Sequence, residues 1–131
     1  MATIIVVEDD LTNARVAQRV LSRMGGHSVE VSEDGDRVLE LCVRGEVDLV
    51  VMDISLGSTR VDGRAVDGVR LTQLIRRQAE GGGPPVLVLT AHAMRGDRDR
   101  ILSESGADDY LAKPIVDHQE LVERVDALLA A

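Results

Sequence analysis

The sequence predicts an α/β fold in which helices cover both faces of a parallel sheet. Five short apolar runs alternate with longer segments whose apolar residues recur at helical spacing. This alternation is typical of repeated strand–helix units. Because 131 residues suffice for a single hydrophobic core, we expect residues 1–131 to form one domain.

The apolar runs are the expected strands, and their flanking residues indicate where each lies. The first, third and fourth runs are continuously apolar, as in strands covered on both faces. The second run alternates, and the fifth is short and bordered by charged residues, which is typical of edge strands. With right-handed crossovers, this favours a flavodoxin-like doubly wound (βα)5 sheet in the order 2-1-3-4-5. The runs span residues 4–7, 29–31, 49–52, 86–89 and 110–112.

Helical periodicity is clearest in the first and last of the connecting segments. Residues 11–24 carry Val16, Val20 and Leu21 on one stripe, and the last segment repeats the pattern from Leu121 onward. We expect further helices near residues 36–44, 67–79 and 97–105. Residues 54–67 follow neither periodicity and contain glycines, so we expect an extended loop there.

Composition narrows the classes of function. The 15 basic and 23 acidic residues give a formal charge of −8, which argues against direct nucleic-acid binding. No apolar run is long enough to span a membrane. The single cysteine, Cys42, cannot form an internal disulfide, and the first residues lack the pattern of a signal peptide. We therefore expect a cytoplasmic protein.

Polar residues gather where the expected strands end. In an open α/β sheet, ligands bind beyond the carboxyl ends of the strands, near the point where strand order reverses. Glu8 and Asp9 follow the first strand, Asp53 the third, Thr90 the fourth and Lys113 the fifth. Converging carboxylates repel one another, and oxygen ligands suit a hard cation, so we expect a Mg²⁺ site.

These residue types point to phosphoryl chemistry. The carboxylate of Asp53 is ionised at neutral pH and can attack phosphorus without a neighbouring base. Mg²⁺ and Lys113 would offset charge on the phosphoryl oxygens, and Thr90 would donate a hydroxyl hydrogen bond. Asp10 follows the first expected strand, as Glu8 and Asp9 do, but an acidic residue at this place can equally serve as a helix N-cap.

Four motifs in this order resemble the receiver domain of two-component response regulators, the CheY-like family. The resemblance covers essentially the whole chain. The motifs are residues 6–10 (VVEDD), 51–54 (VMDI), 88–91 (VLTA) and 106–114 (GADDYLAKP).

The resemblance implies a role for each of these residues. Asp53 becomes the aspartate phosphorylated by a histidine kinase or phosphotransfer protein, and Lys113 its salt-bridge partner, preceding a cis proline. Thr90 and Tyr110 become the switch residues. Mg²⁺ becomes the cofactor, held by Glu8, Asp9, Asp53 and the main-chain carbonyl of Ser55.

The family also implies how such a domain acts. Apart from Mg²⁺-assisted self-phosphorylation and autodephosphorylation, it is not an enzyme. Phosphorylation switches a protein-binding face formed by the fourth helix, fifth strand and fifth helix, which contacts an unidentified protein target. His92, two residues beyond Thr90, lies where the family tunes the attack of water on the phosphoryl group.

The sequence departs from the family between residues 54 and 67. The family usually has proline four residues after the phosphorylated aspartate, where this chain has Gly57. An Asp-Gly pair normally opens the third helix; we align Asp67-Gly68 with it, which makes the preceding loop longer than usual. This loop is either a partner-contacting or phosphate-shielding lid or a solvated insertion.

Two other classes of function share parts of this pattern. A Mg²⁺-dependent phosphohydrolase with an aspartate nucleophile usually has a second aspartate two residues later, where this chain has Ser55. A flavodoxin-like cofactor binder needs a hydroxyl- and glycine-rich loop after the first strand, where this chain has residues 8–10 (EDD).

Overall fold

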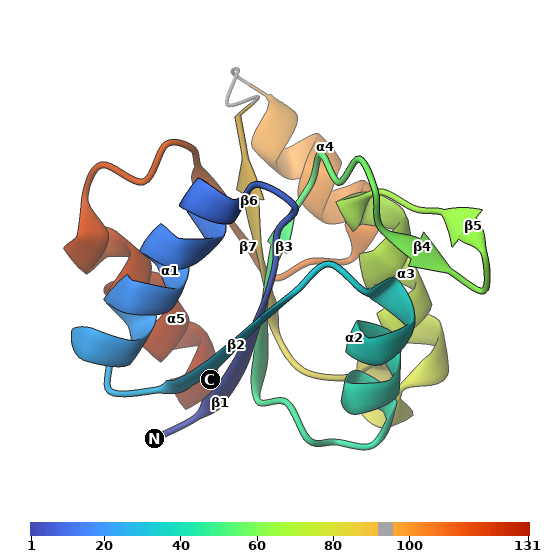
Figure 1. The fold of residues 1–131 in the computed structure, drawn as a ribbon, viewed down its shortest axis with the longest axis horizontal. Helices are drawn as coiled ribbons and strands as arrows, with labels where there is room; N and C mark the ends of the chain where they lie inside the picture. Colours follow the sequence, from blue (N-terminus) through green and yellow to red (C-terminus); the bar gives the residue numbers. More distant parts are fainter. Residues whose placement is uncertain (92–95) are drawn as a thin grey trace.

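The computed structural model describes residues 1–91 and 96–131, which form a five-stranded parallel sheet between two layers of helices (Figure 1). Across the sheet the strands lie in the order β2-β1-β3-β6-β7. This confirms the predicted order 2-1-3-4-5, because β6 and β7 are the fourth and fifth strands of this sheet along the chain. The bounds are Thr3–Val7 (β1), Ser28–Ser32 (β2), Leu49–Asp53 (β3), Val86–Thr90 (β6) and Asp109–Ala112 (β7).

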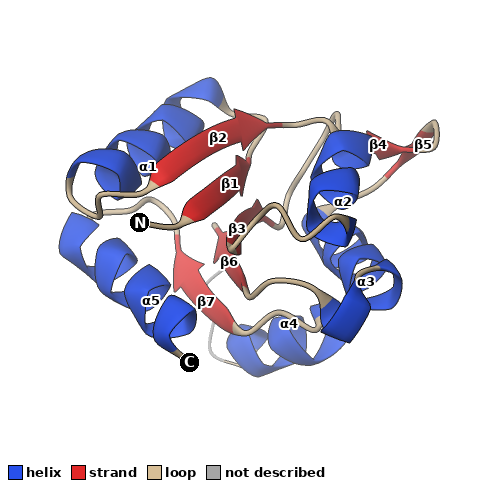
Figure 2. Cartoon of the chain, turned by 90° about the horizontal axis from the view of Figure 1, so that it is seen from below, coloured by secondary structure: helices blue, strands red, loops and turns tan. Residues whose placement is uncertain are grey.

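Helices α1 and α5 cover one face of the sheet, and α2, α3 and α4 cover the other (Figure 2). All five lie where the periodicity predicts them. None of the helices within the described ranges is long and apolar enough to cross a lipid bilayer. The bounds are Leu11–Arg23 (α1), Gly35–Val43 (α2), Gly68–Gln78 (α3), Asp97–Ser105 (α4) and His118–Ala130 (α5), with a short 3-10 helix at Glu80–Gly82.

The core is divided between the two faces of the sheet. Successive residues of a strand point to opposite faces, so a continuously apolar strand contributes to both helical layers. On β1, Ile4 and Val6 pack toward α1 and α5, whereas Ile5 and Val7 pack toward α2 and α3. Each of the four is at most 1% exposed, as expected for an inner strand.

The segment expected as a long loop, residues 54–67, contains a small antiparallel hairpin (Figure 1). Its strands are β4 (Arg60–Val61) and β5 (Arg64–Ala65), which pair Arg60 with Ala65. The two-residue turn between them is Asp62-Gly63, with φ of 51° and 79°. Such turns need positive φ at both positions, which Asp-Gly adopts readily. Leu56 and Val66 anchor the base of the hairpin in the core beside α2 and α3.

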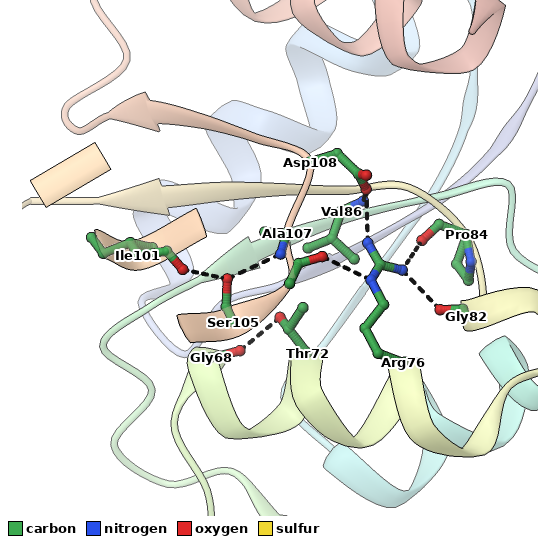
Figure 3. Close-up of polar contacts among 11 residues, drawn as sticks. Gly68, Thr72, Arg76, Gly82, Pro84, Val86, Ile101, Ser105, Ala107 and Asp108 are labelled. Atoms are coloured by element: carbon green, nitrogen blue, oxygen red, sulfur yellow. Dashed lines mark hydrogen bonds and ion pairs between the residues drawn. The ribbon is translucent and has the colours of Figure 1, made fainter. Parts of the chain in front are cut away.

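The guanidinium group of Arg76 joins α3 to the amino-terminal end of the sheet (Figure 3). It donates to the carbonyl oxygens of Gly82, Pro84 and Gly106 at 2.7–2.9 Å and to Asp108 Oδ2 at 2.7 Å. The same Asp108 oxygen accepts the backbone N–H of Val86 at 2.8 Å. Arg76 therefore ties two connecting segments, α3–β6 and α4–β7, to one helix, at the opposite end of the sheet from the expected site.

Candidate functional site

Three carboxyl groups meet at the carboxyl ends of the two central strands. Glu8 and Asp9 follow β1, and Asp53 ends β3, the neighbouring strand in the sheet. Each offers one oxygen within 4.8 Å of the others. Glu8 is 5% exposed and Asp53 only 3% exposed. The fold therefore brings together the three carboxyl groups predicted from their places at strand ends.

The ammonium group of Lys113 completes the cluster. Its Nζ lies 2.9 Å from Asp53 Oδ1 and 3.4 Å from Glu8 Oε2, and 13% of its side chain is exposed. The backbone N–H of Lys113 donates to the carbonyl oxygen of Thr90 at 2.8 Å, which continues the β6–β7 pairing beyond the strands. The peptide bond from Lys113 to Pro114 is cis, as the family resemblance implies.

Burial and neighbouring charges shift the proton affinities of Glu8 and Lys113. Burial raises the pKa of Glu8 to about 7, and the neighbouring Asp53 adds to the rise. Burial alone would lower the pKa of Lys113, but its hydrogen bond to Asp53 and the charges of Asp53 and Glu8 outweigh this and raise it. With one lysine facing three carboxyl groups, the cluster favours binding a further cation.

The first turn of α3 packs directly against the end of β3. A side-chain carbon added to Gly68 would collide with the carbonyl oxygen of Asp53, so only glycine permits this approach. Asp67 caps the helix by accepting the N–H of Arg70 at 2.8 Å. The structure thus confirms that α3 opens at the Asp67-Gly68 pair and shows that this pair positions the helix beside Asp53.

The carboxylate of Asp53 also accepts a hydrogen bond from its own loop. The backbone N–H of Ser55 donates to Asp53 Oδ1 at 3.2 Å. This bond places the backbone of Ser55 directly beside the acidic cluster. The family resemblance implies that the main-chain carbonyl of this same residue, Ser55, is a cation ligand.

The two expected switch residues lie on the adjoining strands. Thr90 ends β6 and is fully buried, one residue beyond the position that pairs with Asp53. Tyr110 lies on β7 opposite Val88 and is half-buried. Asp10, by contrast, is the N-cap of α1 and accepts the N–H of Asn13 at 3.0 Å. His92 lies outside the described residues.

One contact at the site was not predicted from the sequence. The backbone N–H of Gly57 donates to Asp9 Oδ2 at 2.7 Å and joins the base of the hairpin to the acidic cluster. No pattern of side chains in the sequence indicates this hydrogen bond, because its donor is a main-chain N–H group. The available signal was the glycine itself, since proline at this position would have no N–H to donate.

The described side chains suit a hard divalent cation. Carboxylate oxygens are the ligands that Mg²⁺ prefers, and the cluster of Glu8, Asp9 and Asp53 contains neither histidine nor cysteine. The open side of the cluster is formed by Asp9, which is only half-buried. Mg²⁺ retains several waters in protein sites, so partial exposure is compatible with its binding.

The chain belongs to the response regulator receiver domain family, whose model matches residues 4–126. A curated relative, the signal transduction histidine-protein kinase BarA of Escherichia coli, is 34% identical over 113 residues, which are 86% of this chain and 11% of BarA. The response regulator MprA of a Mycobacterium strain is 36% identical over 126 residues, 96% of this chain and 50% of MprA. The chain thus spans half or less of these relatives.

Solved structures lead to the same family. A Francisella response regulator receiver domain has a TM-score of 0.80 and 28% identity, covering 99% of this chain and 98% of that one. The receiver domain of a sensor histidine kinase from Pseudomonas aeruginosa has a TM-score of 0.81 and 32% identity, with the same coverage. That structure has a magnesium ion coordinated in its active site cleft.

Membership of this family decides between the classes considered from the sequence. Residues 4–126 are a receiver domain with a phosphoacceptor role in two-component signalling. Receiver domains are signalling modules rather than ordinary enzymes, so the phosphohydrolase alternative is set aside. A flavodoxin-like cofactor binder shares only the fold with this chain.

Proposed function

We propose that Asp53 accepts a phosphoryl group from a histidine kinase or a phosphotransfer protein. The observation that carries this proposal is the buried pair of Asp53 Oδ1 and Lys113 Nζ, 2.9 Å apart at the carboxyl end of a central strand. One Asp53 oxygen forms a bond to the phosphorus of the donor's phosphohistidine. The nitrogen–phosphorus bond breaks, and the histidine nitrogen leaves with its electrons. The salt bridge orients the carboxylate for attack.

Mg²⁺ is the proposed cofactor, held by Glu8, Asp9, Asp53 and the main-chain carbonyl of Ser55. When bound, it neutralises charge on the phosphoryl oxygens. The half-buried Asp9 would be a direct ligand, whereas Glu8, turned toward Lys113, would act through water. The ammonium of Lys113 stabilises the phosphoryl oxygen on its own side.

Phosphorylation of Asp53 adds about −1.5 to −2 charges beside Thr90 and Lys113. Thr90 would turn its hydroxyl toward the new phosphoryl group, and Tyr110 would change rotamer with it. Both residues adjoin the face formed by α4, β7 and α5, where a protein target would bind. To invert a 1:99 population, phosphorylation must favour the active state by about 5.5 kcal/mol.

Labelling with acetyl phosphate in the presence of Mg²⁺ tests the assignment. We expect Asp53→Asn to abolish the label, as measured by intact mass, because the amide lacks the nucleophilic carboxylate. Asp99→Asn is the matched control, since the side chain of Asp99 is 93% exposed on α4. If Asp53→Asn were labelled as fully as the control, the proposal would be wrong.

A further inference from the structure

The hairpin inserted after β3 is joined to the acidic cluster by one short hydrogen bond. Gly57 N–H donates to Asp9 Oδ2 at 2.7 Å, across 48 positions of sequence. Asp9 is the most exposed of the three carboxylates, so its side chain has the greatest freedom to rotate. A main-chain donor that holds one oxygen restricts this rotation and leaves the other oxygen available to a cation.

Gly57 lies between a buried residue and the base of the hairpin. Leu56, immediately before it, is buried in the core, and the N–H of Val66 donates to the carbonyl oxygen of Thr59 at 3.0 Å to close the hairpin base. The carboxylate that Gly57 holds therefore depends on the hairpin remaining in place.

Helix α2 holds the other end of the hairpin. At the turn, the N–H of Asp62 donates to Asp36 Oδ1 at 2.9 Å. A side-chain carbon added to Gly35 would lie 2.5 Å from the carbonyl oxygen of Arg60, so the hairpin rests directly on the first turn of α2. The hairpin is thus fastened at one end to α2 and at the other to Asp9.

We infer that Gly57 is a positioning residue for the cation, and that cation binding and closure of the β4–β5 hairpin stabilise each other. The inference rests on the proposed Mg²⁺ site. Groups that hold a metal ligand in place typically change metal affinity 10–100-fold when they are removed. The closed hairpin is the state in which Gly57 is bonded to Asp9 and Asp62 to Asp36. Because coupling between two equilibria is reciprocal, Mg²⁺ must favour this closed state by the same factor.

The first experiment compares Mg²⁺ affinity in two variants of residue 57 by isothermal titration calorimetry. Gly57→Pro removes the N–H, and we expect it to weaken Mg²⁺ binding about tenfold or more. Gly57→Ala keeps the N–H; its added carbon would lie 3.2 Å from Asp9 Oδ2, at the end of a side chain that can adjust. We expect the alanine variant to stay within about threefold of the parent. Equal affinities in the proline and alanine variants would overturn the inference.

A second pair of variants decides the question even if Gly57→Pro does not fold. Asp36→Ala and Asp36→Asn lose the same charge, but only asparagine keeps an oxygen that can accept the N–H of Asp62. If α2 holds the hairpin in place, the alanine variant binds Mg²⁺ several-fold more weakly than the asparagine variant. If the two variants have the same affinity, the hairpin does not support the site.

Limited proteolysis measures the reciprocal effect. Arg60 and Arg64 are exposed on the hairpin, whereas Arg44 is exposed at the end of α2. We expect saturating Mg²⁺ to slow tryptic cleavage at the hairpin about tenfold more than cleavage at Arg44, and Gly57→Pro to remove the difference. Equal slowing at both places would show global stabilisation only and would contradict the inference.

These outcomes separate the inference from the proposed function. If the parent protein binds no Mg²⁺ and Asp53 takes no label, the proposed function and the inference are both wrong. If the parent binds Mg²⁺ and is labelled at Asp53, but the variants at Gly57 and Asp36 behave like it, only the inference is wrong.

Discussion

The carboxyl group of Glu8 lies among two other carboxyl groups and one lysine, with 2% of its side chain exposed. Water cannot solvate its charge there, and Asp53 repels it, so the neutral form is favoured. Glu8 consequently retains a proton under conditions in which an exposed glutamate has lost it. This makes the metal-free site sensitive to pH near neutrality.

We expect the metal-free protein to lose stability as the pH rises from about 4.5 to about 7. Over this range the folded protein holds a proton on Glu8 that the unfolded chain has already released, so the unfolding free energy falls with rising pH. A pKa rise of this size corresponds to roughly 3–4 kcal/mol, because one pKa unit is about 1.4 kcal/mol. Urea denaturation at several pH values, with a chelator present, measures the decline.

The variant Glu8→Gln provides the control, because its neutral side chain does not titrate. Its unfolding free energy should fall less than that of the parent over the same range. Parallel curves for the two proteins would mean that another group causes the decline.

At the scale of elements, the contacts of Arg76 explain how α3 is attached (Figure 3). Its guanidinium makes three bonds to carbonyl oxygens and one to Asp108, in directions that a lysine ammonium cannot match. Removing it leaves three carbonyl groups in two connecting segments without these donors. Hydrogen bonds to charged groups contribute about 1.5–3 kcal/mol each when partners are buried.

We expect Arg76→Ala to lower the unfolding free energy by about 2–4 kcal/mol, and Arg76→Lys by less. The side chain of Arg76 is 23% exposed, so water compensates for part of the loss. Chemical denaturation monitored by circular dichroism measures both values. Arg77→Ala, at the exposed neighbouring position on α3, should stay within about 0.5 kcal/mol of the parent; a similar loss there would show a general effect on the helix.

The main elements could be predicted because each follows a periodicity that burial enforces. Val50 and Met52 face one layer while Leu49 and Val51 face the other, so β3 had to be continuously apolar. The hairpin was missed because its strands are two residues long, too short to show alternation. Its one local signal was the turn at Asp62-Gly63, which the sequence shares with many loops.

The site was predictable as far as it depends on side chains at strand ends. Glu8, Asp9, Asp53 and Lys113 each directly follow or end a strand, and the parallel sheet brings these ends together. The hydrogen bond from Gly57 to Asp9 could not be predicted, because it depends on the path of a loop rather than on a residue type.

At the scale of the whole molecule, the acidic cluster stores repulsion that a cation would relieve. Binding to the folded state alone stabilises it by an amount that grows with ligand concentration. At a Mg²⁺ concentration 100 times the Kd, we expect the unfolding free energy to rise by about 2.7 kcal/mol and the Tm to rise with it. Differential scanning calorimetry with and without Mg²⁺ measures the change.

Two variants show whether the stabilisation arises at the site. Asp9→Asn should remove most of the Mg²⁺ effect, because a neutral amide is a weaker ligand than a carboxylate. Asp126→Asn, which alters the contact of α5 with His27 at 3.0 Å, should retain it. An undiminished Mg²⁺ effect in Asp9→Asn would indicate binding elsewhere on this acidic protein.

The chain has no tryptophan or phenylalanine, and its single tyrosine is Tyr110 on β7, three residues before Lys113. Ultraviolet emission from the unlabelled protein therefore originates at one known position. A spectroscopist can follow the surroundings of that ring in real time as acetyl phosphate and metal are added, without attaching a dye and without assigning the signal among several fluorophores.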